Sequence, residues 1–335
     1  MIIVTGGTGL LGSHLLFHIA QNDELAFIRA SYRSEHKIIL VKKLFEQLDH
    51  INSKKLFNKI QWLKADLANP FDVQKLLEDG TQVYHCSALV SFFSSDFPKL
   101  LKQNREITAL IVKTCLDIQN IRLCYVSSTA AVGNSKEIPT TENTKWELTK
   151  KTSAYSLSKF LAEKEVWRGI EEGLDAVIIN PCVILGAGDW NESSLSILKT
   201  AAKGISFYTT GSNAVVDARD VAKCMIKLMN SPITADRFLC TGENISYFEL
   251  FTKMATLLGK KPPKVKAPYY LAWAAAFINE QLQFFSTKKT GLSRDAVNSS
   301  YKTISYDSTK LITSVDHRFY SIEETIDYAI KNRIS

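Results

Sequence analysis

Short apolar runs alternate with longer amphipathic stretches through the first half of the chain. The apolar runs predict buried parallel strands at residues 1–4, 26–32, 60–64, 82–86, 123–127 and 175–180. Apolar residues at helical spacing predict helices around residues 15–20, 42–48, 97–120 and 153–172. This alternation favours an α/β fold with a Rossmann-type, doubly wound parallel sheet.

Beyond Pro181 the pattern changes to loops, short strands and short helices, including a predicted helix at 247–258. We therefore expect an NAD(P)-binding Rossmann domain over residues 1–180, with 213–245 returning to it. Residues 181–335 are expected to form mainly a smaller, interleaved C-terminal substrate domain. The longest apolar stretch, 267–278, is too short to span a membrane. The sequence leaves open whether 267–285 forms a lid, an interface between subunits, a membrane-surface contact or core.

The first predicted strand runs into a glycine-spaced turn, Thr5 to Gly12, with the sequence T-G-G-T-G-L-L-G. Gly6 permits a tight turn, Gly9 lets the backbone approach a pyrophosphate, and Gly12 lets the following helix pack on the strand. The free N–H groups of that helix then face the phosphates. The expected contacts to this part of a dinucleotide are Gly6, Thr8, Gly9, Leu10 and Leu11. A glycine-rich turn without a ligand is the alternative.

Composition excludes several other classes of protein. The formal net charge is +7, but the basic residues are scattered, so we expect no nucleic-acid partner. Six cysteines lie far apart without metal-ligand spacing, which predicts buried thiols in a reducing compartment and no metal site. A first strand that begins at Met1 leaves no place for a signal peptide, and no stretch is long enough to span a membrane. We therefore expect a soluble, cytoplasmic protein.

Tyr155 and Lys159 lie four residues apart in a predicted helix, so their side chains share one face. A tyrosine near an ammonium group suits proton transfer, because the positive charge favours the phenolate. A solvated surface pair is the alternative. The strand at 123–127 ends in the hydroxyls Ser127, Ser128 and Thr129, where ligands of open α/β sheets bind and where a hydroxyl can hold a carbonyl oxygen.

Together these motifs resemble the extended (atypical) short-chain dehydrogenase/reductase family, in the NAD-dependent epimerase/dehydratase superfamily. The motifs that carry the resemblance over almost the full chain are Thr5–Gly12, Asp66 with Leu67, Ser127–Gly133, Tyr155-x-x-x-Lys159, Pro181 and Asp217–Ala222. Within the family, the stretches 28–33 and 242–247 resemble the dihydroflavonol reductase and 3β-hydroxysteroid dehydrogenase branch.

The resemblance implies roles for individual residues. Tyr155 would be the acid/base, and Lys159 would bind the nicotinamide ribose and lower the pKa of the tyrosine. Thr129 would hold the substrate oxygen, or Ser128 if the register is one residue earlier. The further cofactor contacts that we expect are Asp66, Leu67, Cys86, Ser87, Ala88, Asn104, Pro181 and Val183. Two of these have structural alternatives, Asp66 as a turn residue and Asn104 as a tie between helix and sheet.

The end of the second predicted strand favours NADPH over NADH, with NAD as the alternative. An NAD-preferring enzyme usually has a carboxylate there, to accept from the ribose 2′-hydroxyl. Here Arg33 occupies that place and Lys37 follows. Arg33 can make a bidentate contact to a 2′-phosphate, although it could also be a solvated loop residue.

We therefore expect reduction of a carbonyl group to an alcohol by hydride transfer, with Tyr155 as proton donor. The expected pocket is aromatic and apolar, which suits a hydrophobic carbonyl substrate, and its candidate residues are 88–93, 182–185, Tyr208, Tyr269, Tyr270 and Trp273. Packing between the domains is the alternative for Trp273. A homodimer is left open.

Two other functions are weighed against the reductase. A nucleotide-sugar epimerase or dehydratase is less favoured. Ala130 and Ala131 stand where a dehydratase of this family has its acid and base, and Val183 stands where an asparagine is usual. A non-catalytic, NAD(P)-sensing protein is less favoured because Tyr155 and Lys159 are both present.

Overall fold

The computed structural model describes residues 1–22, 27–133, 139–149, 152–283 and 292–334. Its largest element is a seven-stranded parallel sheet in the order β11-β6-β5-β4-β1-β2-β3. The strands are β1 (Ile2–Thr5), β2 (Ile28–Tyr32), β3 (Ile60–Lys64), β4 (Gln82–His85), β5 (Arg122–Val126), β6 (Asp175–Pro181) and β11 (Asp236–Cys240). This order confirms the predicted Rossmann-type, doubly wound sheet.

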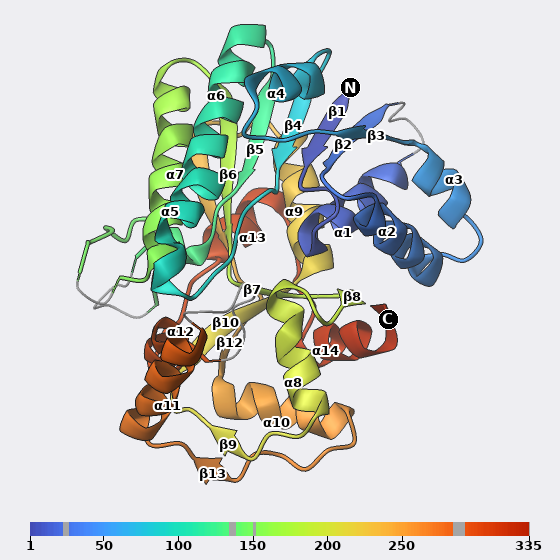
Figure 1. The fold of residues 1–335 in the computed structure, drawn as a ribbon. Coiled ribbons are helices and arrows are strands. Elements are labelled where there is room, and N and C mark those ends of the chain that lie inside the picture. Colours follow the sequence, from blue (N-terminus) through green and yellow to red (C-terminus); the bar gives the residue numbers. More distant parts are fainter. Residues whose placement is uncertain (23–26, 134–138, 150–151, 284–291, 335) are drawn as a thin grey trace.

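Helices cover both faces of this sheet (Figure 1). One face packs against α1 (Leu10–Ala20), α2 (Glu35–Leu48), α3 (Ser53–Asn58), α9 (Ala218–Met229) and α13 (Thr309–Val315). The other face packs against α4 (Pro70–Leu77), α6 (Ile107–Ile118) and α7 (Ala154–Glu171). Successive strand residues alternate between the two cores, as Ile2 and Ile3 do in β1. Burial on both faces explains why the strands read as continuous apolar runs.

Several predicted boundaries need correction. The expected helix at 97–120 is interrupted: α5 (Phe97–Leu100) leads into a π-helical turn, η2 (Leu101–Glu106), before α6. Such a turn inserts an extra residue and re-aims the side chains within it. No helix is predicted between residues 64 and 82, yet α4 forms there: Pro70 is its first residue, and the N-cap Asn69 accepts from the Phe71 N–H at 3.0 Å. Strand β2 begins at Ile28, and residue 26 lies outside the described part.

A smaller unit lies at the carboxyl end of the sheet (Figure 1). Its centre is a three-stranded sheet of β7 (Val183–Leu185), β10 (Ser212–Asp217) and β12 (Glu243–Ser246). Two parallel pairs flank it, β8 (Gly188–Asp189) with β14 (Arg333–Ile334) and β9 (Phe207–Tyr208) with β13 (Val265–Lys266). Its helices are α8 (Ser196–Ala202), α10 (Tyr247–Leu257), α11 (Tyr269–Leu282), α12 (Arg294–Ser300) and α14 (Ile322–Lys331).

The two units are interleaved along the chain. Within residues 213–245, α9 and β11 pack with the large sheet, whereas β10 and the first residues of β12 belong to the small one. The site described below therefore lies where β5 and β6 end and the chain crosses between the units. Among the described residues, no helix has the length and apolar character needed to cross a membrane.

Candidate active site

The glycines of the turn after β1 are required for two different reasons: two of them pack closely against the chain, and one borders open space. Gly6 has a φ of +67°, and a Cβ there would lie 2.7 Å from the backbone nitrogen of Ser87. A Cβ on Gly12 would lie 2.2 Å from the carbonyl oxygen of Gly6. Gly9 differs, because its Cβ would meet only the Gly6 oxygen, at an ordinary 3.4 Å. Contacts within the chain thus require glycine at positions 6 and 12, whereas at Gly9 a side chain would fill only the space in front of the turn.

This turn fits the pyrophosphate of a dinucleotide. Gly9 is the N-cap of α1, and no side chain caps the helix there. The first N–H groups of α1 are therefore available to an anion. The N–H of Gly6 donates to the Ser31 hydroxyl at 3.3 Å, which ties the turn to β2.

The predicted residues for the adenosine end lie around the ends of β2 and β3. Arg33 is exposed directly after β2, and its Nη1 donates to Oε1 of Gln103 at 3.4 Å. Lys37 forms an ion pair with Glu192, and both line a hollow together with Thr8 and Gly9. Lys37 thus lies beside the glycine turn, held by a residue of the smaller unit.

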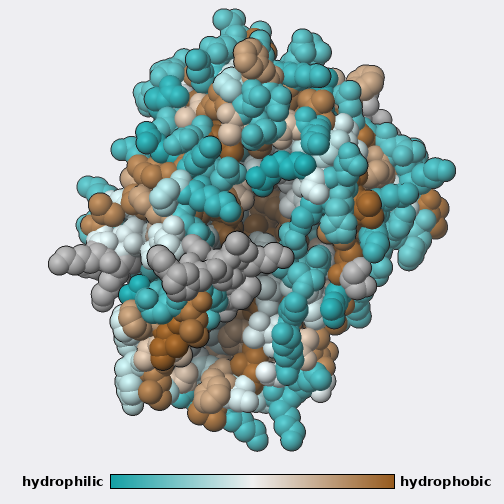
Figure 2. Space-filling model, viewed as in Figure 1, coloured by the Kyte–Doolittle hydropathy of each residue, from teal (hydrophilic) through white to brown (hydrophobic). Residues whose placement is uncertain are grey.

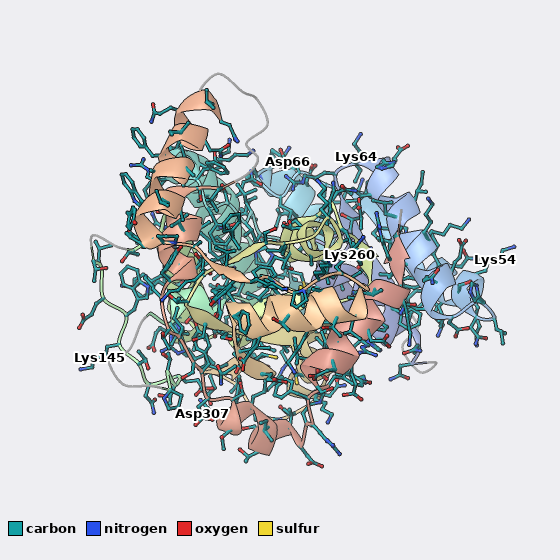
Figure 3. The ribbon with its side chains drawn as sticks, turned by 90° about the horizontal axis from the view of Figure 1, so that it is seen from below. Lys54, Lys64, Asp66, Lys145, Lys260 and Asp307 are labelled. Atoms are coloured by element: carbon teal, nitrogen blue, oxygen red, sulfur yellow. The ribbon has the colours of Figure 1, made fainter. Side chains whose placement is uncertain are left out.

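Asp66 makes the turn contacts that were its structural alternative. It is exposed after β3, near Lys64 (Figure 3), and its carboxylate accepts from the Ala68 N–H at 3.1 Å. The adjacent Leu67 is buried in the core. A contact of Asp66 or Leu67 to the adenine stays a prediction.

The segment after β4 lies against the glycine turn. The Cys86 N–H donates to the Thr5 carbonyl at 3.2 Å, and Ser87 lies under Gly6. Asn104, in the π-helical turn, is 1% exposed; its Oδ1 accepts from the Leu89 N–H at 2.7 Å. Its Nδ2 donates to the Leu89 carbonyl and to the Ser158 hydroxyl. Asn104 therefore ties η2 to this segment and to α7, and its contact with a nicotinamide stays a prediction.

Tyr155 lies in the first turn of α7 and meets the end of β5. Ser153 caps the helix by accepting from the Ser156 N–H. The Ser128 side chain lies beside the Tyr155 hydroxyl, and the Phe92 ring lies 6.1 Å from the tyrosine ring. Burial raises the pKa of Tyr155 above its ordinary value, and the neighbouring Ser128 side chain opposes that rise. The phenol therefore holds its proton at neutral pH and is equipped to donate it.

Thr129, the first choice from the sequence, does not meet Tyr155. Its hydroxyl is hydrogen-bonded to Tyr306, and it is 6% exposed. The reason is local: Ser128 is the N-cap of the short 3₁₀ turn η3 (Thr129–Ala131), which turns Thr129 away. The structure thus brings the alternative, Ser128, to the tyrosine.

Comparison with known proteins decides the family. Residues 2–238 match the model of the NAD dependent epimerase/dehydratase family. The chain belongs to this family. It is accordingly an NAD(P)-dependent enzyme, in a family whose members act on alcohol and carbonyl groups of small molecules as oxidoreductases, epimerases and dehydratases.

Individual relatives cover most of the chain. It is 25% identical to sterol demethylase protein B of Methylococcus capsulatus over 283 residues, which are 84% of this chain and 81% of that protein. It is 26% identical to dihydroflavonol 4-reductase of Callistephus chinensis over 307 residues, 86% and 79% of the two chains. The solved UDP-glucuronic acid 4-epimerase of Bacillus cereus, in complex with UDP-glucuronic acid and NAD, has a TM-score of 0.77 at 17% identity. That match covers 99% of this chain and 98% of the epimerase and shows the shared fold.

The Lys159 side chain is buried, with 1% of its surface exposed. Its Nζ donates to the Tyr125 hydroxyl and to the Val126 carbonyl, both at 2.8 Å. Burial lowers the pKa of Lys159 to about 7, although the nearby Glu163 carboxylate favours the charged form. The shift at Tyr155 comes from its burial and from Ser128, so the expected tuning of the tyrosine by Lys159 stays a prediction.

Glu163 is a buried carboxylate that the sequence analysis missed. It is 3% exposed and accepts from the Ser127 hydroxyl at 2.6 Å, from Asn180 Nδ2 at 2.8 Å and from Arg237 Nη1 at 3.1 Å. The sequence could have predicted its position, because Glu163 lies four residues after Lys159 and therefore on the same inward face of α7. These bonds fix α7 to β5, β6 and β11.

A second polar chain, also missed, continues from Tyr125 across the sheet. The Thr108 side chain lies beside the Tyr125 hydroxyl, and Thr108 Oγ1 lies 3.2 Å from His85 Nε2. His85 Nδ1 lies 2.6 Å from Thr5 Oγ1, and burial lowers the pKa of His85 to about 3, so the ring is neutral. The sequence held one clue: Thr5 and His85 lie at the ends of two predicted strands. In the structure these strands are neighbours, and Thr5 is the register partner of His85.

The remaining predicted residues are distributed between the units. Pro181 ends β6, and Val183 begins β7 opposite Val215, at the crossover. The aromatic candidates of the smaller unit pack on one another: Tyr208 on Phe248, Tyr269 on Tyr301, and Trp273 on Phe277. Of the predicted pocket residues, Phe92 is the one with a recorded ring contact to Tyr155.

The buried ammonium group of Lys159 predicts a pH dependence of stability. Unfolding restores an ordinary pKa near 10.5, so between about pH 7 and pH 10.5 the unfolded chain binds one proton more than the folded chain. The wild-type free energy of unfolding should therefore rise relative to that of Lys159→Met by about 1.4 kcal/mol per pH unit in this window. Urea unfolding at a series of pH values measures the difference, with the exposed-site variant Lys54→Met as control. Parallel curves for wild type and Lys159→Met would contradict the buried charge.

Proposed function

We propose that the chain is an NADPH-dependent reductase that converts a carbonyl group of a hydrophobic substrate to an alcohol, with Tyr155 as proton donor. The observation that carries the proposal is the half-buried Tyr155, whose protonated hydroxyl lies beside Ser128 at the carboxyl end of β5. Two hydroxyl donors directed at one place suit a carbonyl oxygen that gains negative charge as it is reduced. Reductase activity in a sequence relative, dihydroflavonol 4-reductase, supports the same chemistry.

The protein's part in the reaction follows from this arrangement. Ser128 and Tyr155 hydrogen-bond the carbonyl oxygen and orient the substrate. When bound, NADPH would supply the hydride that a carbonyl carbon needs. Tyr155 then gives its proton to the oxygen and regains one from solvent, so that the carbonyl is converted to a secondary or primary alcohol. Lys159, one turn along α7, is proposed to bind the nicotinamide ribose.

Charge around the end of β2 supports NADPH. Arg33 and Lys37 bring two cations to the place where an NAD-preferring enzyme has a carboxylate. A guanidinium group recognises a phosphate through two parallel hydrogen bonds. The Glu192 carboxylate, which pairs with Lys37, would compete with a 2′-phosphate for the Lys37 ammonium group.

The apolar surroundings of Tyr155 support a hydrophobic substrate. Phe92 is 44% exposed beside the tyrosine, in the segment after β4 that also holds Ala88 and Val90. Ala130 and Ala131 offer no acid or base for elimination of water, which disfavours a dehydratase. The names of relatives that act on sterols and flavonoids accord with an apolar substrate.

Three variants test the proton donor and the oxygen-binding hydroxyl. We expect Tyr155→Phe to lower kcat by at least about a hundredfold, because general acid catalysis is lost. Ser128→Ala should lower kcat more than the matched Thr129→Ala, whose hydroxyl faces Tyr306 instead. The assay is NADPH consumption on a ketone or aldehyde found by screening carbonyl compounds and nucleotide sugars. An unchanged rate in Tyr155→Phe would refute the assignment, and a greater loss in Thr129→Ala would restore the residue first chosen from the sequence.

Arg33→Asp tests the cofactor. The carboxylate should repel a 2′-phosphate and accept from a ribose 2′-hydroxyl, so the ratio of kcat/KM for NADPH to that for NADH should fall at least tenfold. Arg105→Asp, on the outer face of η2, is the control for a general change of charge. If only Lys37→Asp changed the ratio, the phosphate contact would lie at Lys37. Purified protein that retained NAD tightly through turnover would favour an epimerase.

A further inference from the structure

Helix α11 presents an apolar face to solvent. The residues on its outward face are Tyr270, Leu271, Ala274, Ala275, Phe277, Ile278, Gln281 and Leu282. They recur at helical spacing, and none of them is charged. Tyr270 is 70% exposed, Ile278 59% and Leu282 74%. A surface helix of a globular protein normally presents charged residues to water.

Two polar residues of α11, Asn279 and Glu280, lie on its half-buried side and help to hold the helix in place. The Glu280 carboxylate accepts from the N–H and from Nε of Arg294, the first residue of α12, at 2.8 and 2.6 Å. Asn279 Nδ2 donates to the Leu292 carbonyl, and the Tyr269 hydroxyl to Asn298 Oδ1. The orientation of the helix is therefore specified by hydrogen bonds and an ion pair, with the apolar face left outside.

Further exposed apolar residues lie on the strand pair β9–β13, at the same end of the molecule, away from the large sheet. Phe207 of β9 is paired with Val265 of β13, and both are exposed, Phe207 by 61%. Figure 1 shows β9, β13 and α11 together at this end, and Figure 2 shows hydrophobic side chains gathered over α11. Contiguous apolar surface of this kind marks an interaction site.

Four lysines accompany the patch. Lys260, Lys261, Lys264 and Lys266 are all exposed in the seven residues around β13, immediately before α11 (Figure 3 labels Lys260). No acidic residue lies between positions 260 and 278. The end of the molecule thus combines an uncharged helix face that carries Tyr and Phe with a cluster of positive charge.

We propose that α11 and the β13 lysines dock the protein on an anionic lipid membrane surface. Apolar and aromatic side chains of an interfacial helix enter the boundary between headgroups and acyl chains, while flanking lysines bind anionic headgroups. Charge favours this occupant over a second copy of the chain, because a second copy would bring four more lysines and no acidic residue from positions 260–278 to pair with them. The inference rests on this surface alone and does not depend on the reaction proposed above.

Vesicle flotation with the full chain tests the docking. We expect binding to phosphatidylcholine vesicles that contain phosphatidylserine, weak binding to phosphatidylcholine alone, and release by salt. Changing Lys260, Lys261, Lys264 and Lys266 together to Gln should lower the affinity by about fivefold per lysine. Leu271→Gln with Ile278→Gln should lower it at least tenfold, because less apolar surface enters the membrane.

Matched controls lie on the large unit. Phe71→Gln with Ile51→Gln removes exposed apolar residues there, and Lys54→Gln with Lys64→Gln removes exposed lysines (Figure 3); both should bind like wild type. Thermal unfolding checks that each variant is folded, and the lysine set tests the proposal even if the apolar pair were destabilised. Absence of binding, equal binding to neutral vesicles, or equal loss in the controls would overturn it. So would a dimer in solution that Ile278→Gln converts to monomer, since the face would then join two copies.

Discussion

The burial of opposite charges on one face of α7 is the constraint on which the site depends. Lys159 and Glu163 lie one turn apart, each almost fully buried, and a buried charge is costly unless it is hydrogen-bonded. Their partners come from the ends of β5 and β6 and from β11. Only one placement of α7 against the sheet allows both charged groups to make these hydrogen bonds. That placement brings Tyr155 beside Ser128.

The same principle orders the layer behind the site. The Tyr125 hydroxyl accepts from Lys159 Nζ and lies beside Thr108. Polar contacts continue from Thr108 to His85 and from His85 to Thr5, so they link the ends of neighbouring strands. Fully paired polar groups in a dry interior are rigid. The tyrosine of the proposed mechanism therefore stands on a preorganised base, with Phe92 beside its ring.

Patterns local in sequence predicted much of this arrangement. The apolar runs predicted the strands of the sheet because burial on both faces demands them, and the glycine spacing predicted the turn at Gly6 and Gly12 that close packing requires. Helical spacing placed Tyr155 and Lys159 on one face. Contacts made across the fold were not predictable. The pairing of Lys37 with Glu192 and the exposure of the apolar face of α11 depend on neighbours distant in the chain, and the short 3₁₀ turn that separates Ser128 from Thr129 gives no periodic signal.

The central claim, net reduction of a carbonyl by this site, is tested most directly by following the hydride. The chain would be incubated with NADPH carrying deuterium at the transferred position of C4 and with a carbonyl substrate, and the product analysed by mass spectrometry. The account predicts an alcohol with one deuterium on the former carbonyl carbon, formed one for one with NADP⁺. Turnover of a nucleotide sugar without net oxidation of NADPH, and with no deuterium retained in an alcohol product, would contradict it.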